Sequence, residues 1–253
     1  QVAYVNNRNV STQGNPAKAV VTDKTGGNYE IAKVEVEFQI TSRTQETLSI
    51  TQKPNTIIYG DQFTLSTSGG SGNGDVTWEI TSGTDVATVD RSSGQVTIIG
   101  HGSATVKATK SGEDPAPVTR AGNYENAIAS WTFTAEKKPV TATVTAEDKS
   151  YDGDTDAVVQ AVVEQGVLAG DVITITGLTG TFNDENAGVD KTVNVNVTGA
   201  TIIGKNSEHY IISYSSATTA VKATIHKAIA SITAPTAPAS LTYNAAEQEL
   251  IAA

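Results

Sequence analysis

A tyrosine followed by a turn-forming residue recurs along this chain at a constant interval. The pairs are Tyr59-Gly60, Tyr151-Asp152 and Tyr243-Asn244, and neighbouring pairs are 92 residues apart. Closing strands are predicted at nearly the same interval, centred on Phe38, Phe133 and Ile225. A unit of about 90 residues has the size of one small β-sandwich domain rather than of a solenoid rung. The recurrence therefore predicts a tandem array of β domains.

A second marker supports this division of the chain. Gly27-Asn28-Tyr29-Glu30 and Gly122-Asn123-Tyr124-Glu125 each stand just ahead of a predicted closing strand. Together the markers predict four parts: the C-terminal part of a preceding β-repeat at 1–43, complete domains at 44–138 and 139–228, and the opening strands of a following repeat at 229–253. Because Gln1 falls within a repeat, we expect the chain to be a segment of a longer protein.

Alternation of apolar and polar residues dominates the sequence, and a helical period is almost absent. Apolar residues take every second position in segments 34–40, 129–135, 193–197 and 221–225. This pattern indicates antiparallel strands with one buried face. Turn clusters at 68–74, 90–94 and 183–188 separate such strands. The predicted fold class is all-β, with tandem β-sandwich domains in an extended array and partial β-repeats at both ends.

One segment has no clear secondary-structure preference, and three short segments are predicted to join the domains. Residues 156–165 are rich in alanine and valine, so both a helix and a strand stay open there. The predicted joints between domains are short, at 41–47, 137–139 and 234–240. The last two contain proline, which favours stiff connections over freely moving ones.

Charge and composition exclude several classes of function. The net charge is −10 and its acidic excess is spread over both complete domains. No basic stripe is available to neutralise phosphates, which argues against nucleic acid and anionic membrane surfaces as partners. No apolar stretch approaches the 18 residues of a membrane span, so we expect no membrane insertion in this segment. The chain has neither cysteine nor methionine, which suits exposure outside a cell, although low cysteine is also ordinary in the cytosol.

Each complete domain carries motifs of a known bacterial family. The segment Tyr59-Gly60-Asp61-Gln62-Phe63, followed by Val76-Thr77-Trp78-Glu79-Ile80 and Gly102-Ser103-Ala104-Thr105-Val106, resembles a bacterial Ig-like repeat of group two. The segment Lys149-Ser150-Tyr151-Asp152-Gly153, followed by Phe182-Asn183-Asp184-Glu185-Asn186, resembles the YDG repeat of bacterial adhesins. The chain is thus similar to a bacterial cell-surface repeat protein, an adhesin-like stalk.

The resemblance implies an Ig-like sandwich fold, an extracellular place on the cell surface and a structural role. The expected function is a stalk segment that projects a functional tip, with neighbouring repeats of the same protein as partners. The alternative is a module that binds a host glycan or protein through its loops. The family brings no catalytic residues, and the sequence offers no nucleophile, base and oxyanion donors in a recognisable order, so we expect no enzyme.

The clearest ligand motif is an alternation of three acids. Asp152, Asp154 and Asp156 form a D-x-D-x-D pattern, which can direct several carboxylates at one calcium ion. The pattern lacks the glycine and the bidentate glutamate of an EF-hand, since Ala157 and Val163 stand at those loop positions. A non-EF calcium site and a solvated acidic turn are therefore both open.

The remaining candidates have structural interpretations. The histidines His101, His209 and His226 have no second ligand at metal-binding spacing, so we interpret them as surface residues. Trp78 and Trp131 share strand faces with apolar residues and are predicted core anchors. This leaves Tyr124, Tyr210 and Tyr214 as candidates for exposed stacking on a glycan.

The two ends of the chain are predicted to hold incomplete sets of strands. Unpaired edge strands seek partners. Either the ends pair with each other across neighbouring molecules by strand complementation, or the chain is a cut inside a longer array.

Overall fold

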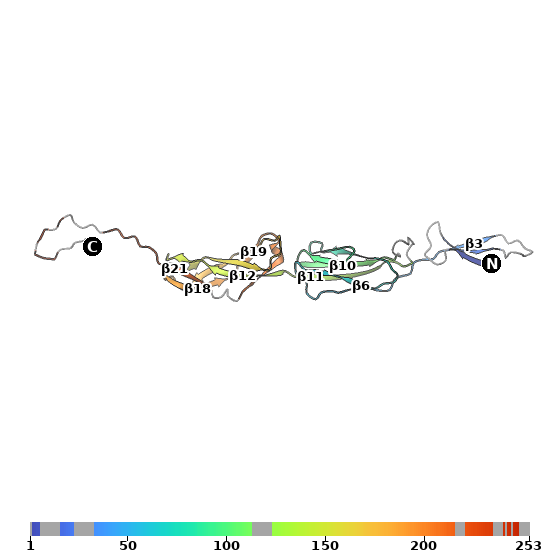
Figure 1. The fold of residues 1–253 in the computed structure, drawn as a ribbon, viewed down its shortest axis with the longest axis horizontal. Coiled ribbons are helices and arrows are strands. Elements are labelled where there is room, and N and C mark those ends of the chain that lie inside the picture. Colours follow the sequence, from blue (N-terminus) through green and yellow to red (C-terminus); the bar gives the residue numbers. More distant parts are fainter. Residues whose placement is uncertain are drawn as a thin grey trace, which may run out of the picture. The chain divides into compact units, whose positions relative to one another are not determined.

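The structure is a computed structural model, and it describes residues 2–5, 16–22, 33–112, 123–215, 221–234, 240, 242–243 and 245–247. The chain divides into two compact units. Unit 1 comprises Gln1–Thr141, Gln165–Thr174 and Ile202–Ser213, and unit 2 comprises Ala142–Glu164, Ile175–Thr201 and Tyr214–Ala253. In the described ranges the regular structure is β-strand, apart from one 3-10 turn, η1 (Ser207–His209) (Figure 1). The all-β prediction is confirmed.

Three strands near the N-terminus form an antiparallel sheet. They are β1 (Val2–Val5), β2 (Ala17–Val21) and β3 (Val34–Phe38), in the order β1-β2-β3. The register aligns Tyr4, Ala19 and Val36 on one face. On the other face Lys18 Nζ lies 3.4 Å from Glu35 Oε2 and 3.0 Å from Glu37 Oε1.

The prediction of a buried face on segment 34–40 is wrong in this sheet. Val34, Val36 and Phe38 are 50%, 58% and 38% exposed. The alternation does form a strand with one apolar face. That face stays exposed because a strand pattern cannot specify the second layer that would cover it.

The β4–β11 region, residues 48–135 of unit 1, builds the larger core. Its strands are β4 (Leu48–Thr51), β5 (Gln62–Thr64), β6 (Ser66–Gly69), β7 (Val76–Ser82), β8 (Ala87–Val89), β9 (Gln95–Ile98), β10 (Gly102–Lys110) and β11 (Ala127–Ala135). They form sheets with the orders β4-β6, β5-β9-β8 and β11-β10-β7. Strands β10 and β11 pair antiparallel along their whole length, from Gly102↔Ala135 to Lys110↔Ala127, and lie side by side in Figure 1.

The core of the β4–β11 region contains fourteen buried residues. Leu65, Val96 and Val106 are at most 1% exposed. Trp78 is 5% exposed, and Trp131 packs against the core with its ring centroid 4.9 Å from that of Phe133. The prediction that both tryptophans pack in the core is confirmed, with Trp78 buried and Trp131 partly buried against it.

The predicted turn at residues 90–94 positions one of these tryptophans. Asp90 Oδ1 accepts hydrogen bonds from the backbone N–H groups of Ser92 at 3.1 Å and Ser93 at 2.7 Å. Gly94 closes the turn with φ 72°, and a Cβ there would lie 2.8 Å from the Trp78 ring. Only glycine therefore allows the turn to approach the indole closely.

The remaining strands follow within the second half of the chain. They are β12 (Lys138–Ala146), β13 (Lys149–Ser150), β14 (Asp156–Ala157), β15 (Val159–Gln165), β16 (Thr174–Thr176), β17 (Thr179–Phe182), β18 (Gly188–Asn196), β19 (Thr201–Ile203), β20 (Tyr210–Tyr214) and β21 (Val221–His226). Residues 156–165 are thus strand rather than helix, as their β-branched content favours. Pro139 lies within β12, so the predicted joint at 137–139 is mostly strand.

Unit 2 contains a five-stranded sheet in the order β13-β21-β18-β17-β14. Strand β13 pairs parallel to β21, and the other neighbours are antiparallel. The core of unit 2 holds six buried residues, of which Phe182, Val193 and Ile225 are at most 2% exposed. The predicted alternation at 193–197 and 221–225 is confirmed.

Some predictions fall outside the described residues. The marker Gly27-Asn28-Tyr29-Glu30 does, as do Gly122 and Asn244. After His226 the described residues contain no strand, so the opening strands at 229–253 and the four domain boundaries stay predictions. Within the described ranges no helix is long and apolar enough to cross a membrane.

Candidate functional site

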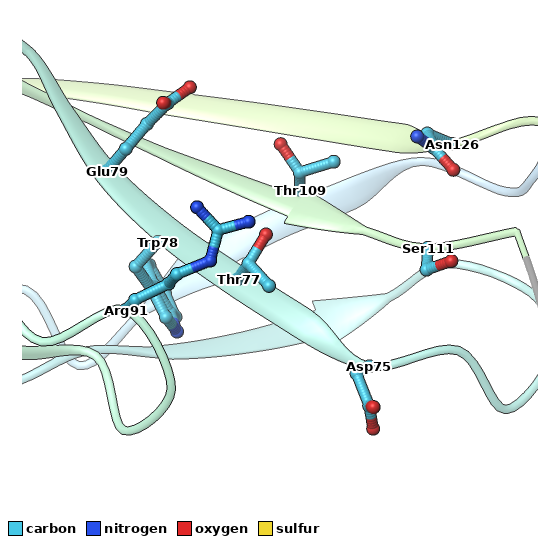
Figure 2. A pocket seen from close by; sticks show the side chains of 8 residues that line it. All are labelled: Asp75, Thr77, Trp78, Glu79, Arg91, Thr109, Ser111 and Asn126. Carbon is cyan, nitrogen blue, oxygen red and sulfur yellow. The ribbon is translucent and has the colours of Figure 1, made fainter. Parts of the chain in front are cut away.

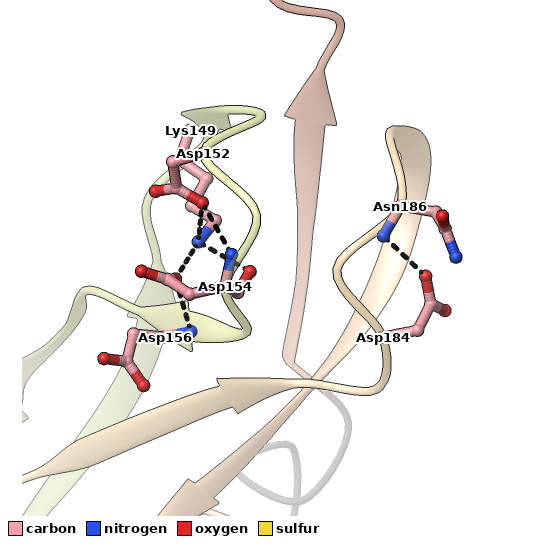
Figure 3. A network of polar contacts seen from close by, with 6 residues as sticks. All are labelled: Lys149, Asp152, Asp154, Asp156, Asp184 and Asn186. Carbon is pink, nitrogen blue, oxygen red and sulfur yellow. Dashed lines mark hydrogen bonds and ion pairs between the residues drawn. The ribbon is translucent and has the colours of Figure 1, made fainter.

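The three acids of the predicted calcium loop fold into two consecutive Asx turns, in which a side-chain oxygen accepts from the backbone two residues on. Asp152 Oδ1 accepts from the Asp154 N–H at 3.2 Å, and Asp154 Oδ1 accepts from the Asp156 N–H at 3.0 Å. Figure 3 shows the Asp156 carboxylate turned away from the other two. The turns therefore bring together two of the three carboxylates.

The ammonium group of Lys149 lies between those two carboxylates (Figure 3). Lys149 Nζ is 2.8 Å from Asp152 Oδ1 and 2.6 Å from Asp154 Oδ1, and it donates to the Asp154 carbonyl at 3.1 Å. Hydrogen bonds from Lys149 to both acids raise the pKa of its ammonium group. The same contact lowers the pKa of the Asp152 carboxyl. Lysine thus takes the oxygen atoms that a metal cation would use.

The structure does not decide the calcium prediction. Within the described part of the chain no three His, Asp or Glu side chains are grouped closely enough to hold a metal ion. A calcium ion at Asp152, Asp154 and Asp156 would have to displace the Lys149 ammonium and turn Asp156 inward. Calcium binding at these three aspartates therefore stays a prediction, and Lys149 is the cation that would compete with it.

A second lysine contact in unit 2 repeats this arrangement on a neighbouring loop. Lys191 on β18 pairs with Asp184, and the Lys191 side chain is only 10% exposed. Asp184 also accepts from the Asn186 N–H at 2.9 Å (Figure 3). The Lys191 contact is the main cause that lowers the pKa of the Asp184 carboxyl. Sequence reasoning did not single out this pair, although Asp-x-Asn is a turn signal.

Two of the three histidines come together in unit 1, which corrects their interpretation as surface residues. His101 Nδ1 lies 2.9 Å from His209 Nδ1, and both residues are partly buried. His226 has a side chain 62% exposed, with Nε2 3.7 Å from Asp148 Oδ2. Spacing along the sequence could not reveal the pair because its members are 108 positions apart.

Tyr210, a predicted stacking residue, is buried instead. Its side chain is 2% exposed, and its hydroxyl donates to Asp171 Oδ2 at 2.5 Å. Burial and the Asp171 contact raise the pKa of Tyr210 to about 12. Tyr59, the first tyrosine of the recurrence, donates to the same oxygen at 3.0 Å. The ring of Tyr210 is therefore not available to a glycan.

Asp171 is the acceptor at the centre of this network. Burial by itself would raise the pKa of Asp171, but hydrogen bonds from Tyr210, Asn206 and Tyr59 hold it below its ordinary value. Asn206 Nδ2 donates to Asp171 Oδ1 at 2.7 Å. All four side chains belong to unit 1.

The other two predicted stacking tyrosines are partly buried. Tyr124 lies beside Gly72, and a Cβ built there would be 3.3 Å from the Tyr124 ring. The Tyr214 hydroxyl is buried without a hydrogen-bond partner among the described residues. Burial raises the pKa of Tyr214. Neither tyrosine is fully exposed, as a residue that stacks on a glycan would be.

A polar hollow of about 340 Å³ lies on the outer side of β7 and β10. Its lining residues are Asp75, Thr77, Trp78, Glu79, Arg91, Thr109, Ser111 and Asn126 (Figure 2). The Arg91 carbonyl accepts from the Trp78 N–H at 3.0 Å, which ties the 90–94 turn to β7. Among the described residues no hydrogen bond or ion pair engages the Arg91 guanidinium, whereas Glu79 is paired with Lys107. The hollow thus offers free donors to a polar ligand.

Comparison with protein families gives two matches along the chain. Residues 46–119 match the bacterial Ig-like domain (group 2), and residues 136–220 match the YDG domain. The predicted resemblance to these two families, in this order, is confirmed. Bacterial Ig-like domains are usually extracellular.

Comparison with solved structures gives cadherin fragments. The crystal structure of Drosophila N-cadherin EC1-4 is 14% identical with a TM-score of 0.25, and the match covers 85% of this chain and 58% of that one. Mouse cadherin-23 EC22-24 is 10% identical with a TM-score of 0.27, covering 84% and 74%. The chain thus spans less than two thirds of the first of these structures. No curated protein matches the chain.

Proposed function

We propose that this chain is a structural stalk segment of a bacterial multidomain protein on the cell surface, with no enzymatic activity of its own. Its work is to hold a functional tip at a distance from the cell. Support comes from the succession of an Ig-like and a YDG match in one chain. The acidic, cysteine-free composition is consistent with an extracellular place.

The observation that carries this proposal is the short connection between β11 and β12, at the start of the YDG match. Strand β11 ends at Ala135 and β12 begins at Lys138. The Glu136 N–H donates to the Ile57 carbonyl at 2.8 Å, and the Glu136 carbonyl accepts from the Tyr59 N–H at 2.9 Å. The backbone between the strands is therefore hydrogen-bonded to Ile57 and Tyr59 and does not form a free linker. A spacer that transmits force requires such a fixed connection.

Small-angle scattering of the chain tests the spacer. We expect an elongated particle, and a variant with a flexible Gly-Ser insertion after Lys137 should give a broader distribution of dimensions because the Glu136 hydrogen bonds no longer fix the connection. A compact globule from the unmodified chain would contradict the proposal. Antibody labelling of intact cells that make the full-length protein tests its place on the surface.

The second candidate is a glycan-binding module, and the hollow beside Arg91 favours it. Asp75, Arg91 and Asn126 supply the charged and amide groups that bind sugar hydroxyls. A glycan array with the wild-type chain and Arg91→Ala tests it, with Lys222→Ala as a surface-charge control. Binding that is lost in Arg91→Ala alone supports this function, and silence of the wild type over a broad panel contradicts it.

We also propose that the chain ends pair across neighbouring molecules. The apolar face of the β1-β2-β3 sheet is exposed, and Ile229, Ile232 and Tyr243 are 98%, 86% and 88% exposed. Strand complementation between one molecule's N-terminal sheet and another's C-terminal residues would bury both surfaces. Light scattering over a range of concentrations should show association. A monomer at every concentration would rule the pairing out.

A further inference from the structure

The histidine pair of unit 1 forms a contact that a spacer does not require. His101 lies between β9 and β10, and His209 is the last residue of η1. His209 Nδ1 lies 2.9 Å from His101 Nδ1 and also accepts from the His101 backbone N–H at 3.3 Å. An imidazole nitrogen that accepts hydrogen bonds carries no proton. The contact therefore fixes His209 with Nδ1 unprotonated.

The other ring nitrogens fit one neutral arrangement. His209 Nε2 lies 3.6 Å from Glu208 Oε1, so the proton of a neutral His209 resides on Nε2. His101 Nδ1 then carries the proton that it donates to His209. Addition of a proton to His209 Nδ1 would remove the acceptor of the His101 backbone N–H, and with His101 also charged it would place two N–H groups against each other.

Neighbouring groups confine this contact on two sides. The Tyr59 ring lies against His209, with centroids 4.8 Å apart. A Cβ at Gly100 would lie 3.3 Å from His209 Cε1 and 2.5 Å from the Asp85 carbonyl oxygen. The loop before β10 therefore approaches η1 as closely as a glycine permits, and two like charges could not move apart without opening the contact.

The charges around the pair have opposing effects. Burial, the Lys137 ammonium and His209 lower the pKa of His101, while Glu208 acts in the opposite direction. Beyond Tyr59 lie Tyr210 and the carboxylate of Asp171, to which Lys205 is a neighbouring cation. Tyr59 and Tyr210 stay neutral near neutral pH, since burial raises the pKa of both hydroxyls.

We propose that the His101–His209 contact is an acid-sensitive latch that holds the loop before β10 on η1 when both rings are neutral and releases it when they are protonated. The chain would then carry a pH-dependent element beside its spacer role. A histidine whose folded pKa is lowered stabilises the closed form above its unfolded pKa of about 6.5, and this contribution is lost as the pH falls through the folded pKa.

Amide hydrogen exchange of the whole chain tests the latch directly at the His101 N–H. Comparing protection factors at about pH 8 and about pH 5, we expect protection of the His101 amide to fall by about tenfold in the wild type, because its hydrogen-bond acceptor is lost. His209→Gln keeps a neutral acceptor, so its protection should change less than about twofold. Protection of Val106, which is fully buried, reports whether each variant is folded.

His226→Gln is the matched control, because this exposed histidine lies outside the contact. It should keep the wild-type pH dependence. The latch is refuted if wild-type protection at His101 is the same at both pH values, or if His209→Gln retains the full decrease while Val106 stays protected. The outcome is independent of the scattering experiment, which tests the spacer.

Discussion

The β4–β11 region and unit 2 reach a folded state by different means. Among the described residues, the core of the β4–β11 region has fourteen buried members, including Trp78, whereas the unit 2 core has six. In unit 2 two lysines on strands contact acids in loops: Lys149 contacts Asp152 and Asp154, and Lys191 contacts Asp184. Apolar burial contributes stability in proportion to area. Because the unit 2 core is smaller, we expect hydrogen-bonded charges to contribute a larger share of the stability of its loops.

The two regions should be sensitive to different kinds of substitution. Apolar side chains do not titrate, while ion pairs depend on pH and are screened by salt. We therefore expect the β4–β11 region to respond most to changes of core volume and unit 2 to respond most to changes of charge. Four predictions test this contrast.

Leu65→Ala should give the largest loss. Leu65 is 1% exposed in the core of the β4–β11 region, and the cavity left by a buried leucine costs about 2–5 kcal/mol of unfolding free energy. Ile128→Ala is the control, because Ile128 is 60% exposed on β11. Urea unfolding followed by circular dichroism measures both. Equal losses in the two variants would break the contrast between core and surface.

Lys191→Met should lower the unfolding free energy more than its control does, because Asp184 loses the donor that neutralises it. Lys107→Met is the matched control in the β4–β11 region. Lys107 also pairs with one acid, Glu79, but its side chain is 31% exposed, against 10% for Lys191. Exposed pairs contribute less than about 1 kcal/mol. A larger loss for Lys107→Met would reverse the comparison.

Asp184→Asn should reduce the acid sensitivity of unit 2. The folded pKa of Asp184 lies below its ordinary value because of Lys191. Its carboxylate therefore stabilises the fold above the unfolded pKa of about 3.9, and this stability is lost as the pH falls through the folded pKa. Thermal midpoints at about pH 7 and about pH 3 should differ less in Asp184→Asn than in the wild type. If the two midpoints differ as much in Asp184→Asn as in the wild type, the Asp184–Lys191 contact does not contribute to the acid sensitivity. Glu185→Gln is the control for the loss of one negative charge.

Calcium should give the smallest effect. Extracellular modules bind it at about 10⁻⁴–10⁻³ M, so a few millimolar should raise the thermal midpoint by about 2 °C. Lys149→Gln should increase this rise because the ammonium no longer occupies Asp152 and Asp154. Asp154→Asn should abolish it. No rise in any of the three proteins, or the same rise with magnesium, would mean that the acidic turn is only solvated.

Strand positions were predictable because each depends on a local pattern. The alternation at 129–135 and 221–225 places apolar side chains on one face of a strand, and both segments are buried on that face. The same rule failed on β3, where the pattern is present but nothing among the described residues covers it. Alternation specifies a face of a strand, and a second layer has to come from elsewhere in the chain.

The candidate sites were predictable only in part. The three acids of the turn at residues 152–156 were apparent from their spacing, but two of them contact Lys149, a residue from the preceding strand. The sequence predicts an exposed Tyr210 because no local signal shows that Asp171 accepts a hydrogen bond from its hydroxyl. Contacts between distant segments depend on how the sheets are placed, which periodicity does not encode.

The sequence by itself determined that this chain is all-β and that an Ig-like segment precedes a YDG segment, because the spacing of strands and turns is a local property of the chain. The tertiary structure alone decided the partners of the charged and aromatic side chains. It brought His101 to His209 across 108 positions and buried Tyr210 against Asp171. Hydrogen bonds and ion pairs act over a few ångströms in space, and proximity in space is settled only when the strands have packed.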